Sequence, residues 1–161
     1  MEDKKENQRL IKILKKIWPE YNNKWKSGKF ELPKRRGFWN DNNEENRKKY
    51  LEYLFQAMKF EKKEDWYKII KKDFVKYGGG RLIHKDYYKY GFYDLLNEIY
   101  PDYNLLPWKF KVNLPSNYWK DDKNEKKYLE WLFKEKRFKE PEDWYKINGS
   151  DFDKNYGNGL K

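Results

Sequence analysis

The side chains best suited to bind a ligand are basic residues that gather at three places in the first part of the chain. One is a consecutive run beside aromatic residues, one opens an expected helix, and one lies in an expected helix–turn–helix segment. Lysine and arginine neutralise phosphates and release counterions, and exposed tyrosines stack on bases. The candidate nucleic-acid-binding residues are Lys34, Arg35, Arg36, Arg47, Lys48, Lys49, Arg81, Lys85 and Lys89, and the candidate stacking residues are Tyr87, Tyr88 and Tyr90.

Other interpretations of these residues are open as well. Lys48 and Lys49 recur as Lys126 and Lys127 in a matching stretch, which is typical of a solvated helix face. The run Lys34–Arg36 also fits a nuclear localisation signal. Tyrosines at helical spacing are typical of a core. The sequence leaves these alternatives open.

Two acidic pairs, Glu64-Asp65 and Glu142-Asp143, are the candidates for acid–base chemistry. Acidic side chains in the first turn of a helix are stabilised by its dipole, so we expect the four carboxylates to cap short helices. The chain has no Cys and a single His, His84. It offers no nucleophile–base pair, no metal-ligand cluster and no phosphate loop. We therefore expect a protein that is not an enzyme and that holds no cofactor or metal.

The elements that position these residues are encoded twice. Glu64–Tyr67 returns 78 residues later as Glu142–Tyr145, and Asn46–Phe55 matches Asn124–Phe133 at the same offset. Repetition of this kind predicts tandem structural units. Residues that occur in both units are expected to be scaffold.

Hydrophobic periodicity predicts that the units are helical. Residues 7–18 and 44–59 each place apolar side chains on one helical face. Shorter helices are expected at the two EDWY motifs, from Asp73 to Gly78–Gly80, and as a helix–turn–helix pair at 82–88 and 92–100. The expected fold class is all-α, with two tandem, out-of-phase copies of a helical repeat of about 80 residues around an aromatic core. Trp66 and Trp144 are expected to be buried at equivalent places.

The boundaries of the units are out of phase with the chain. Pro19 matches Pro101 at an offset of 82, so residues 1–19 are expected to form the helix that closes the first unit. Residues 20–101 form the first repeat, with the basic loop and the helix–turn–helix-like segment, and 102–161 form a second, truncated repeat. We expect the N-terminal helix to fill the missing last place of the second repeat, in cis or on a neighbouring molecule.

Composition favours a folded, basic protein. Aromatic residues make up 20% of the chain, which supports a core despite 40% charged residues. The net charge is +11, and 18 basic against 10 acidic residues through Lys63 place +8 of it in the first part. This excess favours a polyanionic partner, with DNA expected before RNA. An apolar run long enough for a membrane span is lacking and the N-terminus is charged, so we expect an intracellular protein without signal peptide.

The order of motifs resembles a Trp-rich EDWY repeat family that occurs in giant DNA viruses, algae and some fungi. The motifs that carry the resemblance are Asn46…Tyr50-Leu51…Leu54, Glu64–Tyr67, Gly79-Gly80-x-Leu82, Leu95…Tyr100-Pro101, Pro107-Trp108-x-Phe110 and Trp119. The resemblance makes a viral protein one expectation, with the host cytoplasm, nucleus or virion as its location if the chain is viral, and it implies no activity. Tyr90–Leu96 is similar, over a shorter stretch, to helical repeats that accompany homing endonucleases, which implies contact with DNA.

Two functions follow as hypotheses. The first is a non-catalytic module that holds DNA or RNA mainly through its phosphates. The alternative is a module for protein–protein interaction or self-association, in which exposed Trp and Tyr side chains provide the contacts.

Overall fold

The structure is a computed structural model that describes residues 2–20, 44–82, 88–112 and 114–160. Within these ranges the chain is helical and contains no strand, as the sequence predicted. The α-helices are α1 (Glu2–Ile17), α2 (Glu44–Ala57), α3 (Lys71–Lys76), α4 (Phe92–Ile99), α5 (Asp122–Glu135) and α6 (Gly149–Lys154). Short 3-10 helices lie at Lys63–Lys68, Pro101–Tyr103, Pro107–Lys109, Tyr118–Lys120, Pro141–Lys146 and Asn158–Leu160.

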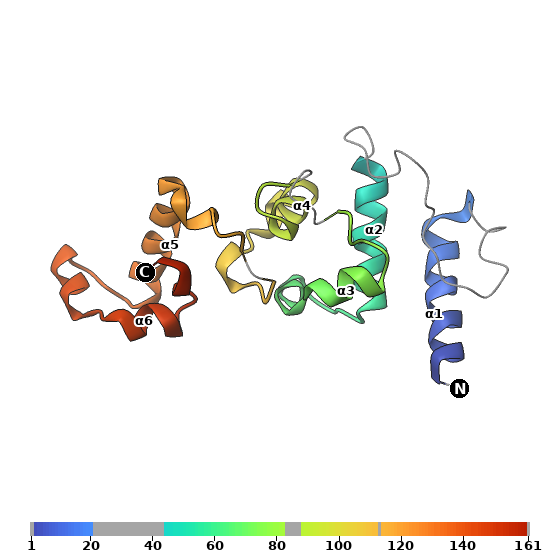
Figure 1. Ribbon diagram of the computed structural model, residues 1–161, viewed down its shortest axis with the longest axis horizontal. Helices are drawn as coiled ribbons and strands as arrows, with labels where there is room; N and C mark the ends of the chain where they lie inside the picture. Colours follow the sequence, from blue (N-terminus) through green and yellow to red (C-terminus); the bar gives the residue numbers. More distant parts are fainter. Residues whose placement is uncertain (1, 21–43, 83–87, 113, 161) are drawn as a thin grey trace.

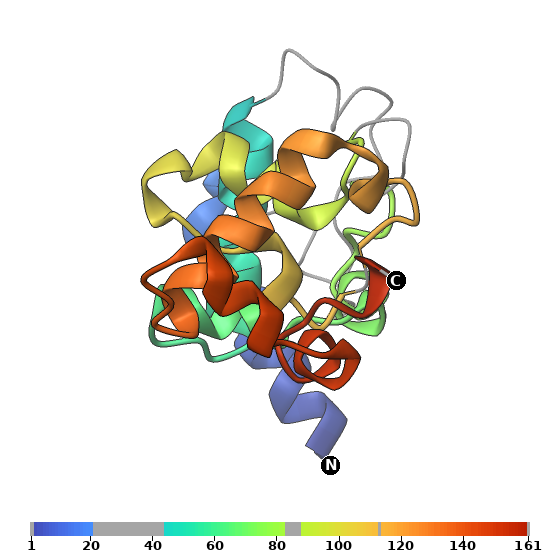
Figure 2. The same ribbon diagram turned by 90° about the vertical axis from the view of Figure 1, so that its left-hand side faces the viewer.

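The helices follow one another along the long axis of the molecule. Helix α1 lies at one end, α2, α3 and α4 lie in the middle, and α5 and α6 lie at the other end (Figure 1). Seen from the C-terminal end, α5 and α6 stand in front of the rest of the chain (Figure 2). The first and last helices are therefore on opposite sides of the molecule.

Helix α1 is amphipathic and packs on α2. Leu10, Leu14 and Trp18 recur at helical spacing and are buried in the same cluster as the α2 side chains. Arg9 donates hydrogen bonds to the carbonyls of Gln56 and Ala57 at the end of α2, at 3.2 and 2.8 Å. The expectation that the N-terminal helix completes the second unit in cis is therefore wrong, because its apolar face is used on α2 instead.

Helices α2 and α5 have the same length and the same ending. Each is 14 residues long, and α5 (Asp122–Glu135) begins and ends 78 residues after α2 (Glu44–Ala57). Lys59 and Arg137 both have φ of 57°, the left-handed conformation that terminates a helix. The amide of Phe60 then donates to the carbonyl of Phe55, as that of Phe138 does to Phe133, both at 3.0 Å. The sequence prediction of 44–59 was thus two residues too long for α2.

The helix–turn–helix pair is only partly described. Its second helix is α4, which begins after Gly91 at φ of 68°. The first, expected at 82–88, falls largely outside the described residues, and its described ends, Leu82 and Tyr88, are not helical. The helix expected after Asp73 is α3, which ends before Gly78 at φ of 78°.

The core consists of two aromatic clusters rather than one. The larger joins α1, α2, α3 and α4, and the smaller surrounds α5. In the larger cluster the Trp66 ring lies between Phe55, Phe60 and Phe92, with centroid distances of 5.6, 5.3 and 5.5 Å. Trp66 is accordingly buried, with 1% of its surface exposed.

Trp144 differs from this expectation. Its ring centroid lies 5.8 and 5.5 Å from those of Phe133 and Phe138. Trp66 contacts the corresponding rings of Phe55 and Phe60 in the same way. It is only half-buried, because α4 supplies Phe92 to cover Trp66 and the described residues give Trp144 no such third ring. The prediction that both tryptophans are buried is therefore confirmed for Trp66 and wrong for Trp144.

Candidate interaction groove and the predicted basic residues

Several of the residues predicted to bind nucleic acid lie outside the described part of the chain. These are Lys34, Arg35, Arg36, Lys85 and the stacking candidate Tyr87. Lys48 and Arg81 are described and exposed. The remaining candidates take part in contacts within the protein.

Arg47 joins two helices. Its side chain is 5% exposed, and its Nη2 donates to Oε1 of Glu98 on α4 at 3.2 Å. Lys49 lies 3.3 Å from Glu45 and 3.6 Å from Glu20, and its side chain is a quarter exposed. The basic cluster at the start of α2 is thus largely neutralised, and Arg47 faces α4 rather than solvent.

The residues before α4 connect it to the second half of the chain. The Tyr90 hydroxyl donates to Oδ2 of Asp121 at 3.1 Å, and the Tyr90 ring packs edge-on against Tyr118 at 4.9 Å. The Lys89 ammonium lies over the Tyr90 ring at 4.9 Å, and the Tyr88 hydroxyl donates to Glu98. These tyrosines are positioned by protein contacts, which limits the ring area available for stacking on a base.

The acidic residues Asp65 and Asp143 fix the EDWY turns. Oδ2 of Asp65 accepts hydrogen bonds from two backbone amides, those of Glu61 and Lys62 at 2.9 and 3.1 Å. Oδ1 of Asp65 accepts from the ammonium of Lys68 at 2.7 Å. The Lys68 hydrogen bond, followed by the two amides, holds the pKa of Asp65 well below its usual range.

Asp143 accepts three corresponding hydrogen bonds, two from the backbone amides of Lys139 and Glu140 and one from the ammonium of Lys146. The pKa of Asp143 is likewise well below the usual range, mainly because of the hydrogen bond from Lys146. A carboxylate held ionised in this way is a poor proton carrier near neutral pH. The capping interpretation is confirmed for both aspartates, whereas Glu64 and Glu142 are exposed.

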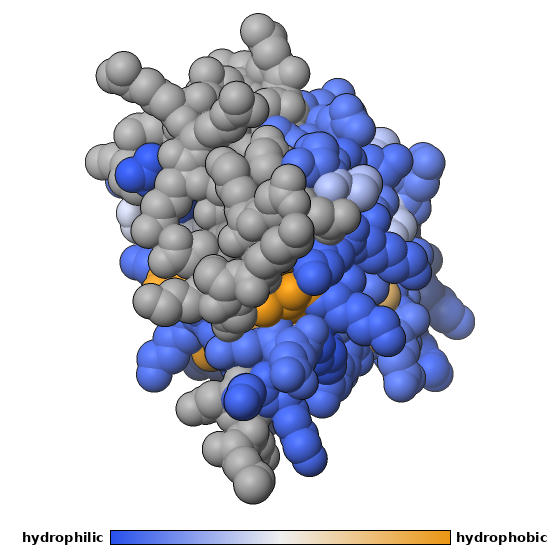
Figure 3. All heavy atoms as spheres, turned by 90° about the vertical axis from the view of Figure 1, so that its right-hand side faces the viewer, coloured by the Kyte–Doolittle hydropathy of each residue, from blue (hydrophilic) through white to orange (hydrophobic). Residues whose placement is uncertain are grey.

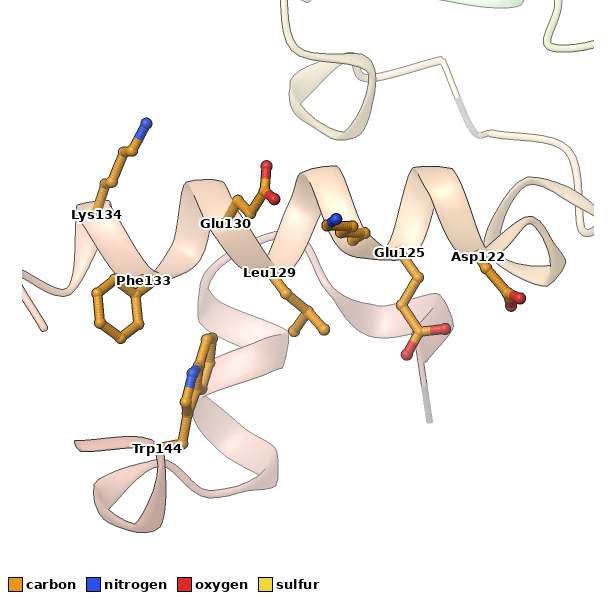
Figure 4. Close-up of a pocket in the computed structure, with 8 residues that line it drawn as sticks. Asp122, Glu125, Leu129, Glu130, Phe133, Lys134 and Trp144 are labelled. Atoms are coloured by element: carbon orange, nitrogen blue, oxygen red, sulfur yellow. The ribbon is translucent and has the colours of Figure 1, made fainter. Parts of the chain in front are cut away.

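An apolar groove on α5 is the feature that the sequence analysis missed. It has a volume of about 590 Å³ and opens to solvent. Its lining residues are Asp122, Glu125, Lys126, Leu129, Glu130, Phe133, Lys134 and Trp144. Figure 4 shows Leu129 and Phe133 on one side of α5, with Trp144 standing opposite them and Glu125 on the same side. An apolar floor with a charged rim is typical of a protein-binding site.

The matching surface on α2 shows what this groove can accommodate. Leu129, Phe133 and Trp144 correspond by the 78-residue offset to Leu51, Phe55 and Trp66. Phe55 and Trp66 line a smaller pocket of about 230 Å³ together with Tyr100 and Tyr103, which follow α4. Phe92 of α4 packs on Trp66 at 5.5 Å, and Leu51 is fully buried. The surface that α4 and the segment after it partly cover on α2 is therefore more open on α5.

A signal for the groove was present in the sequence. Arg47 and Glu125 occupy the same position in two otherwise matching stretches, Asn46–Phe55 and Asn124–Phe133. Arg47 pairs with Glu98 in the structure, and Glu125 carries the opposite charge, so the surface of α5 cannot form the same ion pair with a glutamate. Both stretches were expected to be mainly scaffold, and within them only the basic residues Arg47, Lys48 and Lys49 were considered for binding.

Comparison with known proteins adds no function. No family model, curated protein or solved structure matches the chain. None of the helices in the described ranges is long and apolar enough to cross a membrane. Among the same residues, no group of three or more His, Cys, Asp or Glu side chains is arranged to hold a metal ion.

Proposed function

We propose that this chain is a non-catalytic interaction module that binds an amphipathic helix of a protein partner in the groove on α5. The observation that carries the proposal is the open apolar surface of Leu129, Phe133 and Trp144. Its counterpart on α2 is filled by a helix of the chain itself. Insertion of one helix face into an apolar groove is a recurrent mode of peptide recognition.

The proposal includes tandem repetition of one helical unit. The equal lengths of α2 and α5, the identical φ at their ends and the matching Asp65 and Asp143 turns support it. In repeat proteins each unit buries apolar surface against its neighbour and terminal units carry a polar outer face, so a terminal unit with an apolar outer face has an open face that a partner can cover. The groove on α5 is the open face in this interpretation.

The energetics favour a moderate affinity. Covering an exposed Leu or Phe side chain fully contributes about 1.5–3 kcal/mol, and the groove side chains are already partly covered. Binding also costs translational and rotational freedom. We therefore expect a dissociation constant in the micromolar range for a single helix. The tight end of that range corresponds to a binding free energy of about −8 kcal/mol.

The test uses a peptide of residues 88–104, which contains α4. The peptide carries Glu98→Lys, so that the side chain at position 98 is positive and can pair with the negative Glu125. Isothermal titration calorimetry with the full chain should show saturable one-to-one binding. Leu129→Glu should weaken binding at least about tenfold, because a charge on the groove floor is desolvated by the peptide. Lys127→Glu, exposed on α5 but outside the groove, is the matched control and should leave the affinity unchanged.

Absence of saturable binding, or equal affinity for the wild type and Leu129→Glu, contradicts the proposal. The peptide with its natural Glu98 serves as a second probe. It should bind more weakly than the substituted peptide, because its carboxylate would face Glu125.

Nucleic-acid binding is the second candidate, favoured by the net charge of +11 and by the exposed lysines of α1. Those lysines are Lys4, Lys5, Lys12, Lys15 and Lys16. Fluorescence anisotropy with labelled duplex DNA, single-stranded DNA and RNA over a salt series tests this function. A steep log–log salt slope that falls in Lys34/Arg35/Arg36→Ala would support it. No binding at low salt would exclude it.

A further inference from the structure

We infer that the partner of the α5 groove is helix α1 of a second copy of this chain, which docks through the flank formed by Ile13, Lys16 and Ile17. This inference rests on the proposed function and names its ligand. It requires no rearrangement of α1 within its own molecule.

Helix α1 is similar in sequence to α4, the helix that covers the corresponding surface on α2. Ile17-Trp18-Pro19 of the first segment matches Ile99-Tyr100-Pro101 of the second at an offset of 82. The same offset places Ile13, Lys16 and Ile17 at the positions of Leu95, Glu98 and Ile99. Residues spaced i, i+3 and i+4 share one helix face, so each trio forms a single flank.

This flank of α1 lies beside the face that packs on α2, and Ile13 and Ile17 also pack against the same cluster. Leu10, Leu14 and Trp18 are buried on α2, while Ile13 and Ile17 are only half-buried and Lys16 is exposed. Viewed from the α1 end, the part of the surface that is coloured is mostly hydrophilic, with small separate hydrophobic areas (Figure 3). Helix α1 can therefore remain on its own α2, with Leu10, the counterpart of Phe92, buried there, and still offer the exposed parts of Ile13 and Ile17 beside the exposed Lys16.

The charges select α1 for the α5 groove. On α2, Arg47 pairs with Glu98 of α4 at 3.2 Å. On α5, Glu125 stands in place of Arg47, and on α1, Lys16 stands in place of Glu98. Docking α1 on α5 thus recreates the ion pair with both signs reversed. Docking an α4 flank on α5 instead would set Glu98 against Glu125, a repulsive arrangement.

The geometry makes the contact head-to-tail. The donor helix α1 and the acceptor helix α5 lie at opposite ends of the molecule (Figures 1 and 2). A contact between two different surfaces of the same chain leaves one of each free after dimerisation. Association can therefore continue into a ring or a linear array.

The experiment is sedimentation velocity of the full chain from about 1 to about 500 µM, a range that spans moderate affinities. The wild type should associate increasingly with concentration. Lys16→Glu and Glu125→Lys should each weaken association at least about tenfold, because each places two like charges in the contact. An equimolar mixture of the two variants should associate like the wild type, since every contact between unlike chains is again complementary.

Restoration in the mixture cannot arise from misfolding of either variant, so it separates docking from a structural effect. The inference is overturned if the wild type stays monomeric throughout, or if the single variants associate as well as the wild type. Calorimetry with the residue 88–104 peptide then decides how far the failure extends. Peptide binding with a monomeric chain leaves the helix-binding function standing, whereas loss of both removes the function as well.

Discussion

A paired leucine truncation tests the difference between the covered surface of α2 and the open surface of α5. Leu51 and Leu129 are the eighth residues of helices α2 and α5, which begin at Glu44 and Asp122. Leu51 is fully buried, and Leu129 is half-buried on the groove floor. Replacing each with Ala removes the same atoms from two different environments.

The expected magnitudes follow from burial. The carbons lost from Leu51 carry about 2.4 kcal/mol of transfer free energy at about 0.8 kcal/mol each. The closed cavity raises the cost, so Leu51→Ala should lower the free energy of unfolding by about 3–5 kcal/mol. Leu129→Ala leaves a space that is open to water and loses only partial burial, so about 1 kcal/mol is expected. The difference between the two should be about 2 kcal/mol or more.

Urea denaturation at low protein concentration, followed by tryptophan fluorescence and far-UV circular dichroism, measures both values. Hydrogen exchange with mass spectrometry then assigns each loss of protection to α2 or α5. Leu54→Ala and Leu132→Ala are the matched controls, because both leucines are 0% exposed and occupy corresponding positions. These two should cost similar amounts, each about 2–5 kcal/mol.

Equal costs for Leu51→Ala and Leu129→Ala, with agreement between the controls, would refute the reasoning. Such a result would mean that the α5 surface is already covered in solution. Repeating the series at high concentration adds a second check. The cost of Leu129→Ala should rise there, because an occupied groove adds binding free energy to stability.

Three further perturbations follow from the structure. Gly79→Ala should lower the free energy of unfolding by about 1–3 kcal/mol, because a Cβ there overlaps the buried Tyr50 ring. Gly80→Ala, whose Cβ would lie 3.9 Å from its nearest neighbour, is the control for urea denaturation. Burial raises the pKa of Tyr128 to about 12, above about 10 for a free phenol. Its stabilising contribution should therefore be complete below pH 10 and disappear as pH rises towards 12, a loss that Tyr128→Phe should reduce. Deleting residues 1–18 should remove hydrogen-exchange protection from α2 and leave that of α5 intact.

Features encoded by local spacing were predictable from the sequence. One stripe of Leu10, Ile13, Leu14, Ile17 and Trp18 predicted an amphipathic helix ending at Pro19. Helix α1 has that apolar face, with Leu10, Leu14 and Trp18 buried and Ile13 and Ile17 half-buried. The acidic residues of the EDWY motifs predicted caps, and Asp65 and Asp143 accept the amide hydrogen bonds expected of them. Such features depend on residues within a few positions of one another.

Features decided by contacts between distant segments were not predictable in this way. Arg47 stands in a basic run with Lys48 and Lys49, so local pattern assigned all three to one polar surface. The structure buries Arg47 because Glu98, far along the chain, brings α4 across it. Trp144 is half-buried although its local sequence matches that of Trp66, because burial of the ring also depends on Phe92. The groove on α5 likewise depends on nonlocal contacts, because none of the described helices packs on α5 in the way that α4 packs on α2.

The charge reversal between Arg47 and Glu125 also bears on how the chain folds. Neighbouring units of similar sequence offer a growing chain two alternative surfaces for each helix, and misassembly between units is a characteristic failure of repeat proteins. Helix α4 carries Glu98, which pairs with Arg47 on α2 and would be repelled by Glu125 on α5. We therefore expect this difference in charge to disfavour docking of α4 on α5 while the chain folds, and so to lower the population of mispaired intermediates.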